Sequence, residues 1–190
     1  MPKIDMEAYR KAESFAGGGS YARMVAGGYI VKVQAVRTKW HDSDGNEVDG
    51  ARDKQYVKLI YDIAEGPFAD GGGEVPETDG PLVGKFSDEY WAGEDRDYAH
   101  WICLSWKNLG ALKGMAEAFD GSNDGFDFMA AFDADKWDMF IGRTVGIVVG
   151  EEETGYDENG RMRTRLRLPN ARPADAIREG RFRTDRKSVV

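Results

Sequence analysis

The segment Gly28-Tyr29-Ile30-Val31-Lys32-Val33-Gln34-Ala35-Val36-Arg37-Thr38 alternates between two sets of side chains. Successive side chains of a strand point to opposite faces, so this alternation predicts a β-strand with one buried face. Residues 54–63 repeat the pattern with Val57, Leu59, Tyr61 and Ile63 on one face, and with Tyr56, Lys58 and Asp62 on the other. The two segments therefore predict the first two strands of a sheet.

Further elements follow along the chain in a simple order. Asp157-Glu158-Asn159-Gly160 predicts a hairpin turn, because Asn-Gly tolerates the positive φ angles of tight turns. Residues 101–106 are apolar, but their pattern assigns no element. The predicted elements are strands 28–38, 54–63 and 82–91, helices 108–119 and 133–141, and strands 142–153 and 161–168. This order predicts a mainly β protein with inserted helices, an OB-fold-like five-stranded barrel with helices between strands 3 and 4.

The 190 residues predict one domain with extensions. Its parts are an N-terminal helix with a Gly-rich linker at 1–26, the OB-like domain at 27–172 and a basic C-terminal tail at 173–190. No window approaches the roughly 20 apolar residues of a membrane-spanning helix, and the first residues lack an apolar signal region. Cys103 is the single cysteine, which excludes an internal disulfide. We expect a protein of the cytoplasm with no membrane partner.

The net charge of −8 is unevenly distributed. Residues 1–40 carry +4, residues 41–100 carry −11, residues 101–160 carry −8 and residues 161–190 carry +7. Nucleic-acid binding needs only a local positive surface, so the negative total does not exclude it. The alternative is that the basic ends neutralise the acidic middle when the chain folds.

Four arginines recur at every second residue in 161–168. In a strand, Arg161, Arg163, Arg165 and Arg167 would share one face. Such a row could hold the phosphates of an extended nucleic-acid strand. The alternative is structural: the predicted hairpin would place Glu151 and Glu153 opposite two of these arginines.

A second set combines cations with aromatic rings near the first two strands. Single-strand binders join a basic groove to aromatic rings on which bases stack, and the usual OB-fold site is on these strands and their loops. The set is Lys32, Arg37, Lys39, Trp40, Tyr56 and Lys58. The alternatives are that Trp40 packs over the barrel end and that Tyr56 is a half-buried strand tyrosine. We expect the remaining tryptophans, Trp91, Trp101, Trp106 and Trp137, to lie in or beside the core.

Catalytic and cofactor motifs are weak in this chain. His41 and His100 are isolated, and residues 17–20 lack the lysine and spacing of a phosphate-binding loop. Residues 42–53 begin like an EF-hand, but Glu47 and Asp53 occupy the positions that require glycine and glutamate. The sequence therefore predicts a non-catalytic protein with no metal and no cofactor.

Five segments carry a resemblance to known proteins. They are Gly27-Gly28-Tyr29-Ile30-Val31-Lys32-Val33, Tyr56-Val57-Lys58-Leu59-Ile60-Tyr61-Asp62-Ile63-Ala64-Glu65-Gly66, Ser105-Trp106-Lys107-Asn108-Leu109-Gly110-Ala111-Leu112-Lys113-Gly114, residues 142–153, and Ala174-Asp175-Ala176-Ile177-Arg178-Glu179-Gly180. The chain thereby resembles phage- and prophage-encoded single-stranded DNA-binding OB-fold proteins of replication and recombination modules. The likeness covers most of residues 27–182 and consists of apolar and charged patterns, without a catalytic signature.

The resemblance implies that the partner is single-stranded DNA, bound in a bacterial host cell together with phage replication or recombination proteins. It leaves a homo-oligomer open. The implied binding residues are Lys32, Arg37, Lys39, Trp40, Tyr56, Lys58, Arg163, Arg165 and Arg167. Many such proteins end in an acidic tail that recruits partners, whereas residues 181–190 here are basic. The alternative function is a protein-interaction module that holds a replication or recombination partner through the acidic segment 41–100.

Overall fold

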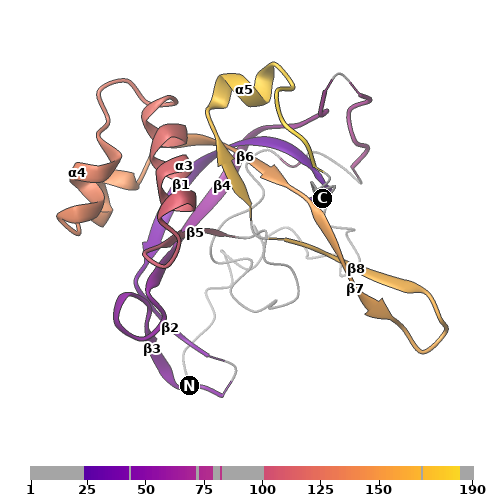
Figure 1. Ribbon diagram of the computed structural model, residues 1–190, viewed down its shortest axis with the longest axis horizontal. Helices are drawn as coiled ribbons and strands as arrows, with labels where there is room; N and C mark the ends of the chain where they lie inside the picture. The colour runs from indigo at the N-terminus through magenta and orange to yellow at the C-terminus, as the bar shows by residue number, and fades with distance from the viewer. Residues whose placement is uncertain are drawn as a thin grey trace, which may run out of the picture.

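The computed structural model describes residues 24–42, 44–71, 73–78, 82, 101–167 and 169–184. Its centre is a five-stranded antiparallel sheet with the strand order β5-β4-β1-β6-β9. The strands are β1 (Gly27–Arg37), β4 (Tyr56–Phe68), β5 (Trp101–Ser105), β6 (Thr144–Val149) and β9 (Asn170–Arg172). The sheet curls into a nearly closed barrel whose two edges are β5 and β9 (Figure 1).

The helices follow the third barrel strand. They are α3 (Leu109–Asp120), α4 (Phe128–Asp133) and the 3₁₀ helix η3 (Trp137–Phe140), all between β5 and β6. The prediction of a mainly β, OB-fold-like five-stranded barrel with helices between strands 3 and 4 is confirmed. Helix α3 begins after Asn108, whose side chain accepts a hydrogen bond from the amide of Ala111. It contacts both edge strands, and so it lies where the barrel is open.

Two of the barrel connections carry small sheets of their own. The β1–β4 connection contains β2 (Lys39–His41), β3 (Glu47–Asp49) and a π-helical turn, η1 (Gly50–Lys54). The β6–β9 connection is the hairpin of β7 (Glu151–Tyr156) and β8 (Met162–Leu166), which projects away from the barrel (Figure 1). In an OB-fold these two connections flank the usual oligonucleotide-binding face.

The third and fifth strands differ from the sequence-based prediction. Of the predicted strand 82–91, only Leu82 lies within the described residues, and the third barrel strand is β5, the apolar segment that the pattern left unassigned. The predicted strand 161–168 is wrong as a barrel strand, because β8 pairs only with β7. Leu166 is the only buried residue of β8, so this strand has too little apolar surface for the barrel wall, and the short β9 takes that place.

The main core fills the barrel interior. The buried face of the first strand is formed by Tyr29, Val31 and Val33, which are each at most 1% exposed. They pack in one cluster with Phe119 from α3 and Phe140 from η3. The strand alternation and the helical spacing of the sequence thus meet in a single core.

A second, smaller core lies on the outer face of β1 and β6. It consists of Ile30, Val148, Ala174, Ile177 and Phe182, with Phe68 packed against it. Helix α5 (Ala174–Arg178) and the segment after it cover this face (Figure 1). The structure describes residues 173–184 of the predicted tail 173–190, and this part of the tail is packed against the barrel. The predicted N-terminal helix lies outside the described residues.

Candidate nucleic-acid interface

The outer face of β4 and β5 carries the aromatic and basic side chains. In β4, Tyr56 and Lys58 alternate with Val57 and Leu59, which are fully buried. The same alternation in β5 buries Ile102 and Leu104 and leaves Trp101, Cys103 and Ser105 half-buried on the outer face. Pairing places Tyr56 beside Ser105, Lys58 beside Cys103 and Ile60 beside Trp101. The second and third barrel strands therefore place these half-buried side chains side by side on the outer face of the barrel.

Lys58 lies between two tryptophans. Its Nζ atom is 4.5 Å from the ring centroid of Trp40 and 4.3 Å from that of Trp101. Trp40 in turn stacks on Tyr56, with ring centroids 5.3 Å apart and an interplanar angle of 29°. We call Trp40, Tyr56, Lys58 and Trp101 the Lys58 cluster. Cation–π attraction holds an ammonium group against such rings and keeps the four side chains together.

The β1–β4 connection positions Trp40. Trp40 pairs with Val48 in the β2–β3 ribbon, and Gly50 follows that ribbon with its amide donating to the carbonyl of Thr38 at 2.6 Å. A Cβ atom on Gly50 would lie 2.4 Å from the Trp40 ring and 2.5 Å from the carbonyl oxygen of Tyr56. Only glycine therefore lets the connection fold so closely against the tryptophan.

Two further cations lie beside the cluster. Arg37 is the cross-strand partner of Lys58, so the two positive side chains are neighbours on the outer face. Lys39 lies in β2 next to Trp40, and its Nζ atom is 3.5 Å from a carboxylate oxygen of Glu47. Both partners of that ion pair are about 60% exposed, so it is weak and leaves Lys39 accessible to an anion. The structure thus brings together Arg37, Lys39, Trp40, Tyr56 and Lys58 of the predicted set.

Lys32 is separate from this cluster. It pairs with Asp62, four residues along β4 from Lys58, or roughly 13 Å of strand. Burial raises the pKa of the Asp62 carboxyl group, and the amide nitrogen of Gln34 donates a hydrogen bond to it. A phosphate at Lys32 would meet this carboxylate, so its surroundings fit an anion less well than those of Lys58.

The arginine row lies on the projecting hairpin. Arg165 pairs with Glu152 in register, and the two side chains form an ion pair with each partner 39% exposed. The expectation that Glu151 and Glu153 face the arginines is wrong, because the register places them opposite Leu166 and Thr164. Arg163 is exposed opposite Gly155 at the bulge of the hairpin. Arg167 lies beyond β8, at the base of the hairpin.

Trp101 is the residue that the sequence analysis placed in the wrong environment. It was expected in or beside the core, but it lies on the outer face with its ring against Lys58. The alternation of residues 101–105 could have indicated this, since Trp101 shares parity with Cys103 and Ser105. Trp106 and Trp137 do pack against the core, as expected, and Trp91 lies outside the described residues.

Cys103 lies beside Lys58 on this face. The pKa of the Cys103 thiol is raised to about 11 by burial, which is only partly opposed by Lys58, so this cysteine is a poor nucleophile at neutral pH. Among the residues that the structure describes, no group of three or more His, Cys, Asp and Glu side chains could hold a metal ion. In the same part of the chain, no helix is long and apolar enough to cross a membrane.

No known protein-family model matches the chain, and no curated protein is significantly similar to it. The site itself places aromatic faces and cations side by side on the outer face of an OB-fold-like barrel.

Proposed function

We propose that this protein binds single-stranded DNA without catalysis, as part of a phage or prophage replication or recombination module. One observation carries the proposal: Lys58 lies between Trp40 and Trp101 on the outer face of the second and third barrel strands. In OB-folds this face and its flanking connections are the usual oligonucleotide-binding surface. The resemblance of the chain to phage single-strand binders supports the biological setting.

The side chains divide the work by their chemistry. Trp40, Tyr56 and Trp101 offer rings on which bases stack, each stack contributing about 1–3 kcal/mol for any base. Arg37 and Lys58 would neutralise phosphates beside those rings, with Lys39 at the margin. Stacking and phosphate contacts are available to any nucleotide, so the proposal is for binding with little sequence preference.

The β7–β8 hairpin extends the surface. It is the connection between the fourth and fifth barrel strands, β6 and β9. In OB-folds this connection contacts nucleic acid together with the connection between the first two strands. Arg163 is exposed on this hairpin, and Arg165 could exchange Glu152 for a phosphate.

The test is fluorescence anisotropy of a labelled oligo-dT of about 30 nucleotides, long enough to exceed the site of one OB-fold. Wild-type protein should bind it with an affinity that falls steeply as salt rises, and should bind duplex DNA weakly. The double variant Arg37→Gln with Lys58→Gln should lower the slope of log affinity against log salt by about 1.4, which is about 0.7 for each phosphate lost.

The matched control is Lys113→Gln with Lys136→Gln. Both lysines are exposed, on α3 and just before η3, and the pair removes the same charge from the helical side of the molecule. This variant should keep the wild-type slope. Absence of any oligo-dT binding at low salt would overturn the proposed function, and a stable complex with a phage protein would then favour the protein-interaction alternative.

A further inference from the structure

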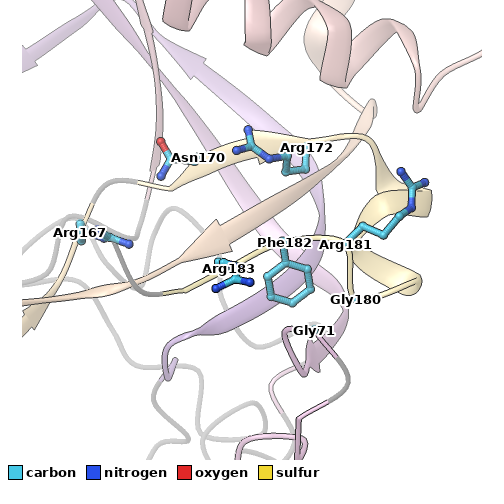
Figure 2. A pocket seen from close by; sticks show the side chains of 8 residues that line it. All are labelled: Gly71, Arg167, Asn170, Arg172, Gly180, Arg181, Phe182 and Arg183. Atoms are coloured by element: carbon cyan, nitrogen blue, oxygen red, sulfur yellow. The ribbon is translucent and has the colours of Figure 1, made fainter. Parts of the chain in front are cut away.

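A pocket of about 650 Å³ lies at the other end of β4 from the Lys58 cluster. Gly71, just beyond β4, forms one side, and Asn170 and Arg172 of β9 form another. Arg167 at the base of the hairpin and residues 180–183 after α5 complete the wall (Figure 2). Phe68 lies ten residue steps along β4 from Lys58, about 30 Å of strand, so the pocket is a separate feature of the surface.

The pocket is strongly basic. Its lining includes Arg167, Arg172, Arg181 and Arg183, and none of the lining residues that the structure describes is acidic. Two carboxylates lie close by, and both are engaged: Glu179 pairs with Arg181, and Asp70 accepts hydrogen bonds from the amide and hydroxyl groups of Thr184. The pKa of the Asp70 carboxyl is lowered by the hydrogen bonds from Thr184 and, to a smaller degree, by the nearby charge of Arg183. Among the described residues, no ion pair within 4.0 Å joins Arg172 or Arg183 to a carboxylate. The pocket thus gathers more positive charge than its surroundings neutralise.

The arginine at the back of the pocket is held in place by the backbone. The Arg167 guanidinium lies directly over Gly150, where a Cβ atom would be 2.0 Å from one of its nitrogens. Its Nη2 atom donates to the carbonyl of Thr184 at 2.7 Å. Its Nε atom is buried and has no hydrogen-bond partner in the described structure. A buried donor without an acceptor is unfavourable, so the Arg167 guanidinium at the edge of the pocket keeps unsatisfied hydrogen-bonding capacity.

The wall formed by the C-terminal segment is also well anchored. Phe182 is 7% exposed in the smaller core, next to Ile177. The amide of Gly71 donates to the carbonyl of Gly180 at 2.9 Å, and the amide of Arg181 donates to the carbonyl of Ala176 at 2.8 Å. The arginines of this segment are therefore presented from a folded wall, so that little further ordering of the backbone is needed when an anion binds.

We propose that this pocket binds phosphate groups of a single-stranded nucleic acid, as a second contact remote from the Lys58 cluster; the proposal is built on the function proposed above. Guanidinium groups match phosphate oxygens with paired N–H donors, which favours phosphate as the anion. Arg163, Arg165 and Arg167 alternate along the returning side of the hairpin, and the amide of Arg167 continues the ladder to the carbonyl of Gly150 at 3.0 Å. The arginine row of the sequence thereby ends inside the pocket.

The test compares oligo-dT of about 5 and of about 30 nucleotides, a short and a long ligand relative to the site of one OB-fold. The variant is Arg172→Gln with Arg183→Gln, two exposed side chains outside the cores, and Lys113→Gln with Lys136→Gln is the charge-matched control. The variant should lower the salt slope for the long oligonucleotide by about 1.4 and leave binding of the short one at the Lys58 cluster unchanged. Equal thermal unfolding of variant and wild type establishes that the fold is kept.

The outcomes separate the two proposals. If wild-type protein binds the long oligonucleotide and the pocket variant has the slope of the control, the pocket proposal is overturned and the proposed function stands. If wild-type protein binds neither oligonucleotide, both are overturned. If an oligo-glutamate of equal charge displaces the long oligonucleotide from wild-type protein but not from the variant, the pocket selects acidic peptides and the assignment to phosphate is overturned.

Discussion

Replacing Trp101 by leucine tests the role of the Lys58 cluster most directly. Trp101 lies on the outer face of β5, while its neighbours Ile102 and Leu104 are fully buried. The substitution therefore removes an aromatic face and leaves the inward side of the strand intact. Leucine is apolar, so the change introduces no buried polar group.

The magnitude follows from the contacts of the ring. One base stack contributes about 1–3 kcal/mol, which corresponds to about 5- to 150-fold in affinity. The salt slope should stay at its wild-type value, because no charge is removed. The loss of the 4.3 Å contact with Lys58 should lower the free energy of unfolding by about 0.5–1 kcal/mol, or a few degrees in Tm.

The assay is the anisotropy titration with oligo-dT at several salt concentrations, with thermal unfolding in parallel. Trp137→Leu is the matched control, because this ring packs 5.6 Å from Phe132 and 6.1 Å from Trp106 on the helical side of the molecule. The control should lose stability and keep its affinity. Stacking on Trp101 would be refuted by a folded Trp101→Leu protein whose affinity is within about twofold of wild type, a change in binding free energy below ~0.5 kcal/mol.

Four further outcomes are expected. Arg163→Gln should lower the salt slope by about 0.7 without a change in Tm, because this side chain is exposed on the hairpin; an unchanged slope would exclude it from the interface. Phe119→Ala should cost about 3–5 kcal/mol in urea unfolding, since the ring is fully buried among core aromatics; a loss below ~1 kcal/mol would contradict the core assignment. Alkylation of Cys103 should be slow at neutral pH and accelerate toward pH 11, because burial raises the pKa of this thiol to about 11. A rate that levels off near roughly pH 8.5, the ordinary pKa of a thiol, would contradict the raised pKa. Burial raises the folded pKa of Asp62 above its unfolded value, so the stability that Asp62 contributes is present below the unfolded pKa and is lost as pH rises through the folded pKa. The substitution Asp62→Asn should therefore raise Tm at neutral pH and change it little below about pH 3.5. Equal changes in Tm at the two pH values would contradict the raised pKa.

The barrel was predictable because its strands and helices have local signatures. The alternation of residues 28–38 and 54–63 predicts β1 and β4, and the spacing of residues 108–119 predicts α3. Side-chain parity in β4 also placed Tyr56 and Lys58 on the outer face. These assignments need only the period of the side chains, which each segment carries by itself.

The contacts between distant segments were not predictable in this way. The register of the β7–β8 hairpin depends on a bulge at residues 153–155, and a shift of one residue changes which glutamate meets Arg165. Trp101 was misplaced because a five-residue apolar segment has no clear period until it pairs with β4. The barrel position next to β6 is taken by the short strand β9 and not by β8, and no local sequence pattern indicates β9.

The sequence by itself determined β1, β4 and α3, the barrel class and the outward side of β4, because these follow from side-chain periodicity within each segment. The tertiary structure alone decided which groups meet: Lys58 between Trp40 and Trp101, Glu152 with Arg165, and four arginines around one pocket. The physical reason is that these neighbours come from segments far apart in the chain. Their distances are set by strand register and by the packing of α5 and the segment after it on the barrel.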